Sequence, residues 1–572
     1  MDKNSILAIV LILIIFILWP VFMKKIGYNT QKTPDHSEQT STEQNVEQKP
    51  ADKTRTSENE PFSYTAESDD NLKQGNNQIS PPKSSVADAD SVIIENSLFR
   101  GVLSTRGGGT IISWKLKDYY YGDKKDSVLV EMIPSNAEDN LVVVPQNRGY
   151  DLINKKYSVI YDTTEAVKRY RFICSLDKNQ KFEKEFIVNP NSFQVGLKLH
   201  FYTMSFEDIG RDYSIQFNSG LRPTEELKKD ERYYQAYALQ GDELLKTKLD
   251  DTDYKEGQTK WMAIRSKYFL MALIPQDEPA AGARLKGEEI KQYYYRGEYQ
   301  KWKTFSTALY IPYKGLEQET EQFTLFIGPM EYNVLKDLDC EIEELMNFGW
   351  PIIRPISIAF YHILEFLNDK VVHNYGWAII VLAILIKIVL YPLTRKSYKS
   401  MRAMQSLQPK ITALKEKYKD DPQKLNQETM KLYKKEGVNP MGGCLPLLLQ
   451  MPVLFALFNL FRTTIMLRQA SFLGGLISDL SAPDGILGGF NLLPILMGAT
   501  MIIQQRLSNQ DPKQKAMAYF MPIFLVFIFF NLSSGLNLYY LMFNLFTIAQ
   551  ELLIKKEKTS DTAVTGPDMR KG

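Results

Sequence analysis

The sequence predicts a multi-domain membrane protein with a core of five transmembrane helices, an N-terminal anchor helix and a large antiparallel β-sandwich domain. Two observations lead to this prediction. Residues Gly376–Leu393 are 18 almost uninterrupted apolar residues, about the length that crosses a bilayer core. Between Ser91 and Pro329 apolar residues instead recur at every second position, as in Phe193–Phe201, which is the period of half-buried strands.

The composition argues against several classes of function. The chain has 572 residues and a net charge of +2, so its overall charge does not indicate nucleic-acid binding. Its three cysteines form no CxxC pair, its four histidines form no HExxH motif, and the sequence has neither a P-loop nor a GxSxG elbow. We therefore expect no catalytic residues, no metal site, no cofactor and no ATP hydrolysis.

The first 90 residues divide into an anchor and a linker. Ile6–Phe22 is apolar, no A-x-A cleavage site follows it, and Lys24 and Lys25 come next. Residues 1–28 are therefore predicted to be an uncleaved transmembrane anchor. Residues 29–90 are mostly Gln, Glu, Ser, Thr, Asn, Lys and Pro, a composition that buries too little apolar surface to offset its ordering entropy. They are predicted to be a disordered linker.

Residues 91–340 are predicted to form the β-sandwich, because alternating runs recur there between turn clusters such as Arg106–Gly109. In one of these runs His200 falls on the polar face. No carboxylates or histidines converge in the pattern, so a binding or scaffolding role is favoured over catalysis. Whether Cys174 and Cys340 form a disulfide is left open. The alternating runs are Ser91–Glu95, Thr110–Leu116, Lys168–Ser175, Lys181–Val188, Phe193–Phe201, Tyr268–Pro275 and Phe305–Pro312.

Residues 341–375 change to a helical period. Their apolar stripe is Ile356, Phe360, Ile363, Leu367 and Val371. An ordinary core helix would have the same pattern. Because the segment directly precedes a membrane span, we expect an amphipathic helix that lies in the plane of the membrane interface.

Residues 376–555 are predicted to form the membrane core, and residues 556–572 a basic tail. The first loop of the core, residues 394–436, holds 12 Lys/Arg and 5 Asp/Glu and is predicted to be a hairpin of two amphipathic helices. Short loops rich in Lys and Arg stay in the cytoplasm, which places the hairpin and both termini inside and the β-sandwich outside. The five predicted spans are 376–393, 443–461, 490–507, 516–532 and 536–554.

One charge, Lys387, lies near the middle of the first core span. A lysine at that depth costs several kcal/mol, so we expect it to face a hydrated groove in the helix bundle, although a snorkelling side chain would be the simpler interpretation. Polar residues on other spans are expected to line this groove, or to join helices as packing contacts. They are Gln450, Gln504, Gln505, Asn537 and Asn544.

Short motifs are dense between Gly376 and Ile554. They are Tyr391–Thr394 (YPLT), Leu407–Lys410 (LQPK), Val438–Pro446 (VNPMGGCLP), Gln450–Pro452 (QMP), Leu467–Ala470 (LRQA), Leu493–Gly498 (LPILMG) and Ser534–Gly535 (SG). Together they resemble the YidC family of membrane-protein insertases in its Gram-negative form, whose β domain is periplasmic. The family usually carries arginine four residues before the YPLT motif, where this chain has Lys387.

This resemblance implies insertion and folding of inner-membrane proteins without ATP, alone or with the Sec translocon. A client would place a short polar, often acidic, segment beside Lys387 and release its apolar helix into lipid. The implied partners are nascent membrane proteins, the lipid bilayer, the Sec translocon, the ribosome and targeting factors. Residues that would contact the client are Met451, Pro452, Phe520, Pro522, Tyr539 and Tyr540.

Two other functions remain open at this point. A solute transporter or channel would carry inverted repeats or interrupted helices, and the sequence shows neither. A carbohydrate-binding or carbohydrate-active β domain on a membrane stalk would need suitably placed side chains, which sequence alone cannot position.

Overall fold

The computed structural model describes residues 91–564, apart from residues 122–127, 135–139, 148–150, 164, 178, 226–230, 296–297, 420, 439–444 and 509–514. The predicted anchor at 1–28 and linker at 29–90 lie outside the described residues, as does the end of the predicted tail.

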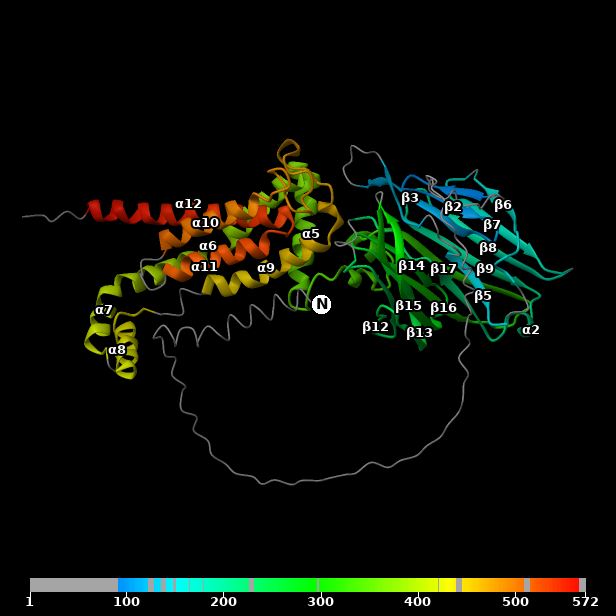
Figure 1. Ribbon diagram of the computed structural model, residues 1–572, viewed down its shortest axis with the longest axis horizontal. Coiled ribbons are helices and arrows are strands. Elements are labelled where there is room, and N and C mark those ends of the chain that lie inside the picture. The colour runs from blue at the N-terminus through cyan, green and yellow to red at the C-terminus, as the bar shows by residue number, and fades with distance from the viewer. Residues whose placement is uncertain are drawn as a thin grey trace, which may run out of the picture. The chain divides into compact units, whose positions relative to one another are not determined.

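The strands of residues 91–329, called the β domain below, form two sheets in which every pairing is antiparallel (Figure 1). The smaller sheet is β1-β2-β3-β4. The larger runs β5-β10-β16-β15-β13-β14-β17-β9-β8-β7-β6, with β11 between β12 and β13. The antiparallel β-sandwich is thus confirmed. The strands are β1 (Ser91–Glu95), β2 (Phe99–Ser104), β3 (Thr110–Tyr120), β4 (Leu129–Glu131), β5 (Asn140–Pro145), β6 (Ser158–Asp162), β7 (Lys168–Ser175), β8 (Lys181–Val188), β9 (Gln194–Tyr202), β10 (Asp212–Phe217), β11 (Gln235–Gln240), β12 (Glu243–Lys246), β13 (Thr252–Arg265), β14 (Phe269–Pro275), β15 (Ala280–Tyr295), β16 (Glu298–Pro312) and β17 (Gln318–Pro329), and the short helix α2 (Phe206–Ile209) lies among them.

The alternation in the sequence is followed closely in β9. Val195, Leu197 and Leu199 are fully buried, whereas His200 points the other way and lies half-buried beside Thr320. A one-residue slip of this strand would expose its whole apolar set, so the pattern determines the register against β8 and β17.

Strand β8 breaks the alternation. Its residue Lys184 is fully buried, and its ammonium donates a hydrogen bond to the carbonyl oxygen of Leu141 and lies over the ring of Phe186. Burial disfavours the charged amine and lowers the pKa of Lys184 to about 7. The β domain therefore contains an amine that changes charge near neutral pH.

A connecting segment leads from the last strand to the helices. It contains α4 (Tyr332–Lys336), η2 (Ile342–Met346), α5 (Arg354–Leu367) and the π-helical turn η3 (Asn368–Val372). Trp261 of β13 donates through its indole nitrogen to the carbonyl oxygen of Cys340 at 2.8 Å. The segment around the predicted boundary at 340 is therefore held against the large sheet. Cys340 and Cys174 are both free thiols.

The buried face of helix α5 differs from the face formed by the predicted apolar stripe. Its buried side chains are Ser357, Tyr361, Leu364 and Leu367, and the Ser357 hydroxyl donates to the carbonyl oxygen of Phe348 at 2.8 Å. Of the predicted stripe only Leu367 is fully buried. The reason is that α5 packs on α9, where the Ser357 hydroxyl donates to the carbonyl oxygen of Ala456 at 3.3 Å, and this leaves Ile356, Phe360 and Ile363 only half-buried.

Five longer helices follow: α6 (Tyr375–Ser406), α9 (Leu445–Thr463), α10 (Leu493–Ser508), α11 (Lys515–Phe529) and α12 (Ser534–Val564). Helix α12 packs on α6, α9 and α10, and α10 also packs on α11 (Figure 1). Among the described helices, Tyr375–Ser406 is long and apolar enough to cross a membrane, and Tyr519–Phe529 is a shorter apolar helix. The short turns η5 (Ile465–Leu467) and η6 (Leu473–Gly475) lie between α9 and α10.

The first core helix is longer than the predicted span. It continues past Pro392 to Ser406, and a new helix, α7 (Gln408–Lys417), begins one residue after the break at Leu407. Pro409 lies in the first turn of α7, where its missing N–H breaks no hydrogen bond within the helix, so a new helix begins there readily. Helix α8 (Pro422–Lys435) forms the second arm of the charged segment.

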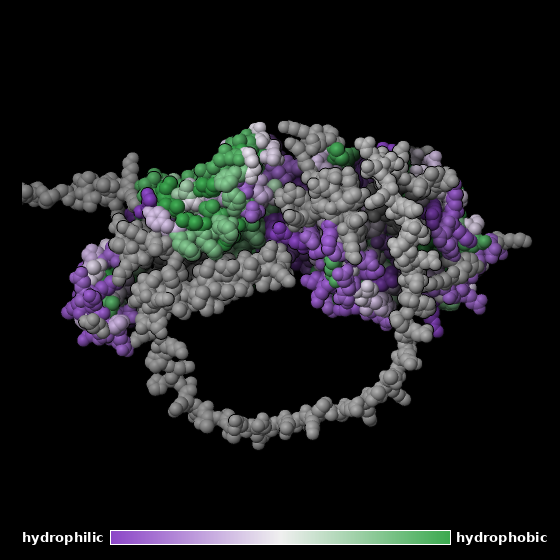
Figure 2. Space-filling model, viewed as in Figure 1, coloured by the Kyte–Doolittle hydropathy of each residue, from purple (hydrophilic) through white to green (hydrophobic). Residues whose placement is uncertain are grey.

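Hydrophobic surface gathers over the core helices on the face shown in Figure 2, while the β domain and the α7–α8 segment are hydrophilic. Large apolar side chains such as Ile388 and Val389 on α6, and Ile523 and Phe527 on α11, are more than half exposed. Such a surface is typical of contact with lipid.

We expect the stability of the β domain to depend on the protonation of Lys184. The folded chain holds the amine with a pKa of about 7, against 10.5 for a free lysine, so the unfolded chain binds more protons between these values. Unfolding free energy should therefore rise with pH from 7 to 9, by at most about 1.4 kcal/mol per unit. Lys184→Met should remove this rise, as measured by urea unfolding followed through tryptophan fluorescence.

The matched control is Lys115→Met, which removes an exposed lysine from strand β3. It should keep the wild-type pH dependence. The same slope in wild type and in Lys184→Met would contradict the expectation.

Candidate functional site

The side chain of Lys387 is buried between α6 and α12. It is 9% exposed, and its ammonium lies 4.2 Å from the centroid of the Phe543 ring on α12. Cation–π contact of this kind offsets part of the cost of burying a charge. Within the part of the chain that the structure describes, Lys387 makes no hydrogen bond or ion pair. The buried ammonium therefore keeps donor capacity for another group.

A buried carboxylate lies further along the same two helices. Glu551 of α12 is 4% exposed and is hydrogen-bonded by the hydroxyl of Tyr398, which lies on the extension of α6. Its charge acts on Lys387. The space between α6 and α12 thus contains one buried ammonium and one buried carboxyl group.

Two further polar side chains join these helices beside Glu551. The Gln550 amide donates to the hydroxyl of Thr394 at 3.2 Å, and this hydroxyl donates to the carbonyl oxygen of Tyr391 at 3.0 Å. Both side chains are buried. Because Thr394 is the last residue of the YPLT motif, this contact gives the motif a structural role: it sets α6 against α12.

The two asparagines of α12 make different contacts. Asn537 is fully buried and its amide donates to the carbonyl oxygen of Phe529 at 3.2 Å, which ties α12 to the end of α11. Asn544 is 3.5 Å from the hydroxyl of Thr500 on α10, at the limit for a hydrogen bond. Asn537 thus joins α12 to α11, whereas the side chain of Asn544 is held only weakly. Asn544 follows Phe543, whose ring lies under the Lys387 ammonium.

The beginnings of α6 and α12 are held by the loop between α9 and α10. Asn374 caps α6 by accepting from the backbone nitrogen of Gly376 at 2.9 Å. The backbone nitrogen of Gly535 donates to the carbonyl oxygen of Leu480 at 2.9 Å, and a Cβ on Gly535 would lie 3.1 Å from that same oxygen. The SG motif thus permits the close approach that brings α12 against the loop.

The other predicted groove residues lie on α9 and α10 and form no hydrogen bond with Lys387 among the described residues. Gln450 on α9 and Gln504 and Gln505 on α10 are all half-buried. No hydrogen bond between them and Lys387 occurs among the described residues. Whether they share a hydrated space with Lys387 stays a prediction.

The predicted client contacts differ in exposure. Phe520 on α11 is 59% exposed, and Met451 and Pro452 on α9 are half-buried. Tyr540 is half-buried, but Tyr539 and Pro522 are buried. A client could therefore touch Phe520 directly, whereas contact with Tyr539 or Pro522 would need the helices to move apart.

Sequence reasoning overlooked Glu551, Tyr398 and Thr394 as site residues. A signal for Glu551 was present, because Asn537, Asn544 and Glu551 are spaced seven residues apart and so fall on one face of a helix. No comparable signal marked Tyr398, whose role depends on how far α6 continues beyond the apolar run.

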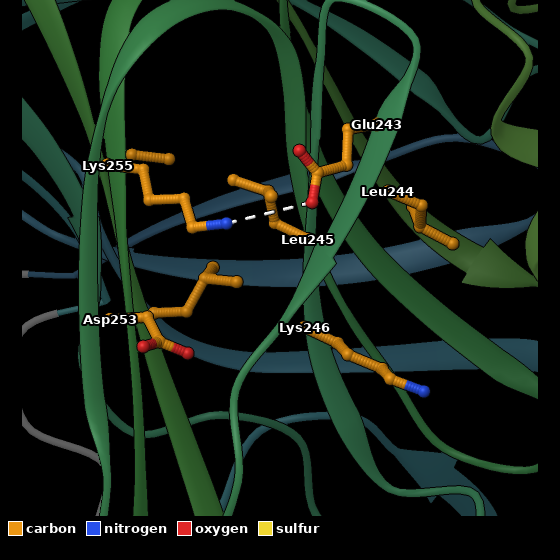
Figure 3. Close-up of a pocket in the computed structure, with 8 residues that line it drawn as sticks. Glu243, Leu244, Leu245, Lys246, Asp253 and Lys255 are labelled. Atoms are coloured by element: carbon orange, nitrogen blue, oxygen red, sulfur yellow. Dashed lines mark ion pairs between the residues drawn. The ribbon is translucent and has the colours of Figure 1, made fainter. Parts of the chain in front are cut away.

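The β domain has a cavity of its own, of about 230 Å³, lined by residues of β12, β13 and β15. In Figure 3 the ammonium of Lys255 faces the carboxylate of Glu243 across it, at 3.7 Å. Asp253 and Lys246 also line the cavity. Its charges are mixed in sign and largely exposed, and the cavity lies in the β domain rather than among the core helices around Lys387. Within the described residues no cluster of His, Cys, Asp or Glu could hold a metal ion.

Two protein-family models match the chain: 60Kd inner membrane protein over residues 366–561, and YidC periplasmic domain over residues 91–358. The membrane protein insertase YidC of Chlorobium luteolum is 34% identical over 98% of this chain and 96% of its own length. The YidC of Chlorobium phaeovibrioides is equally similar. A crystal structure of an active YidC insertase with its first transmembrane domain resolved covers 80% of this chain and 92% of its own, at 20% identity and a TM-score of 0.34.

An antiparallel β-sandwich followed by a helical core with an apolar surface indicates a membrane protein with a large β domain, and the two family models describe an inner membrane protein and a periplasmic domain. The matches extend over both parts in the order found here. The chain belongs to the YidC family of membrane protein insertases, which confirms the resemblance seen in the motifs.

The two asparagines of α12 should differ in their contribution to stability. Asn537→Ala removes a buried donor to α11 and should lower the unfolding free energy by about 1–2 kcal/mol. Asn544→Ala removes only a contact of 3.5 Å and should cost about 0.5 kcal/mol or less. The measurement is SDS-induced unfolding of the purified protein in detergent micelles. Equal losses would show that the distances do not report the strength of the contacts.

Proposed function

We propose that this chain inserts integral membrane proteins into the inner membrane and helps them fold, through a groove in which Lys387 supplies the positive charge. The observation that supports the proposal most is the buried ammonium between α6 and α12, which has no hydrogen-bonding or ion-pair partner among the described residues. Removing such a charge from water is costly, and ionisable side chains buried in membrane helices are usually functional.

The proposed mechanism has two steps: Lys387 first lowers the cost of burying the client's polar segment, and the client's apolar helix then moves into lipid. A client's translocated segment carries polar or acidic residues, and the field of Lys387 lowers the free energy of a carboxylate inside the apolar bundle. The apolar helix of the client then slides along α9 and α11, where Phe520 and Ile523 are exposed, and leaves into lipid. Burial of this helix in lipid supplies the free energy, and the membrane potential adds about 2.3 kcal/mol per charge per 100 mV.

The remaining elements have supporting roles in this proposal. In this proposal the chain has six spans with both termini inside, so the α7–α8 hairpin lies in the cytoplasm, where its basic faces receive clients, ribosomes or targeting factors. The Sec translocon is a further candidate partner, and the amphipathic helix 341–375 frames the bundle at the periplasmic interface. The β domain acts as a scaffold. Insertion is a physical transfer, so no catalytic residue, cofactor or nucleotide is assigned.

The transporter alternative is not favoured, because the relatives that match this chain over nearly its whole length are named as insertases. A carbohydrate-active β domain is not favoured either, since the cavity in that domain offers Glu243 already paired with Lys255.

The test is insertion by three Lys387 variants of matched single-span clients with acidic or neutral translocated segments. Lys387→Arg keeps the charge and should retain most activity. Lys387→Ala should slow acidic clients about tenfold and neutral ones less, because only attraction to carboxylates is removed. Lys387→Glu should be slower still on acidic clients, since repulsion replaces attraction. The readout is protease protection of the client in proteoliposomes.

Protein levels and monodispersity in detergent serve as controls for folding. If Lys387→Glu and wild type insert every client equally well, the charge is incidental and the proposed role of Lys387 must be abandoned. Solute flux without any insertion by the wild-type protein would instead favour a transporter.

A further inference from the structure

We propose that Glu551 is a second charged contact for clients, which binds the Lys or Arg residues flanking the inner end of a client's transmembrane segment. This inference rests on the proposed insertase function and its orientation in the membrane. It assigns to the groove a negative site in addition to the positive one at Lys387.

The first support is the burial of the carboxylate. Glu551 is 4% exposed in a helix that is largely apolar up to this point, and ionisable residues in such helices are costly and are usually functional. Tyr398 hydrogen-bonds the carboxylate, and the neighbouring Gln550 is bonded to Thr394. These contacts hold Glu551 toward α6 rather than toward lipid.

The second support is its position along the groove. Glu551 follows Asn544 by seven residues, so it lies on the same face of α12 as Asn544, and it is about 12 Å further toward the C-terminal end than Phe543. The Lys387 ammonium rests on Phe543 itself. Along this space the ammonium of Lys387 therefore comes first, and the carboxyl group of Glu551 lies deeper, on the proposed cytoplasmic side, with about 12 Å of helix axis between Phe543 and Glu551.

This order of charges matches the charge pattern of membrane proteins. Residues flanking the cytoplasmic end of a transmembrane segment are enriched in Lys and Arg. In the proposed mechanism, the segment that is translocated first is polar and often acidic. A transmembrane segment is about 30 Å long, more than twice the separation of the two sites. One client therefore cannot occupy both sites through its two ends at once, so Lys387 acts on the leading segment and Glu551 acts later on the trailing flank.

A purely structural role for Glu551 makes a different prediction. If the carboxylate only balances the charge of Lys387 or anchors Tyr398, removing it should impair all clients alike. If it binds the trailing flank, the loss depends on that flank. The charge of the client's flank therefore separates the two roles.

The experiment uses the full-length protein in liposomes and two single-span clients that differ only in the residues after the span, Lys-Lys or Gln-Gln. For each client the insertion rate of a variant is divided by that of wild type. Glu551→Gln should slow the Lys-Lys client about fivefold and change the Gln-Gln client less than twofold. Glu551→Asp, which keeps the charge, should restore most of the rate.

Two additional variants complete the test. Tyr398→Phe removes the hydroxyl that positions the carboxylate and should give a smaller loss confined to the Lys-Lys client. The loss of insertion rate in Lys387→Ala should depend on the charge of the client's leading segment and not on the charge of its trailing flank. Thermal unfolding and gel filtration of each variant check that the bundle is intact.

Equal slowing of both clients by Glu551→Gln, or no slowing of either, would overturn the inference. Failure of the wild-type protein to insert both clients would instead count against the proposed function. A client-specific loss in an intact Glu551→Gln variant supports the inference.

Discussion

The buried ammonium of Lys387 constrains the whole helical core. It lies in an otherwise apolar stretch of α6, Gly376–Leu393, and α12 covers it with the Phe543 ring. Once α12 is set against α6, Thr394 and Gln550 meet, and Tyr398 reaches Glu551. One arrangement of α6 against α12 thus gives partners to the polar residues of both helices, and each of these residues would be costly to leave unpaired in a membrane.

The first turns of α6 and α12 are held by hydrogen bonds to the loop between α9 and α10. The loop between α9 and α10 accepts the amide of Asn374 through the carbonyl of Ser471, and its residue Leu480 accepts the backbone nitrogen of Gly535. The two helices are therefore joined at their first turns by backbone contacts and deeper down by side chains. The contact of Asn544 with Thr500, at 3.5 Å, is longer than either of these contacts at the first turns.

The β domain obeys a different constraint, the period of two. Where the alternation is strict, as in β9, the strand could be predicted to within one residue at each end, and its register follows from the apolar face. Where the pattern is broken by Lys184, the sequence suggested an ordinary half-exposed strand, but β8 is covered on both faces. Coverage of the second face depends on distant segments such as the one carrying Leu141, which no local pattern reveals.

The sequence by itself determined the division into a β domain and an apolar helical core, the approximate positions of seven of the seventeen described strands and of the five core helices, and the unusual charge at Lys387. These features follow from local periodicity and from the cost of burying charge, both of which can be read along the chain. Only the tertiary structure decided which face α5 buries, that α6 continues through Pro392 to Ser406, and that Glu551 shares the space between α6 and α12 with Lys387. Those outcomes depend on contacts between residues about 100 or more positions apart, such as Thr394 and Gln550, and a sequence pattern has no information about them.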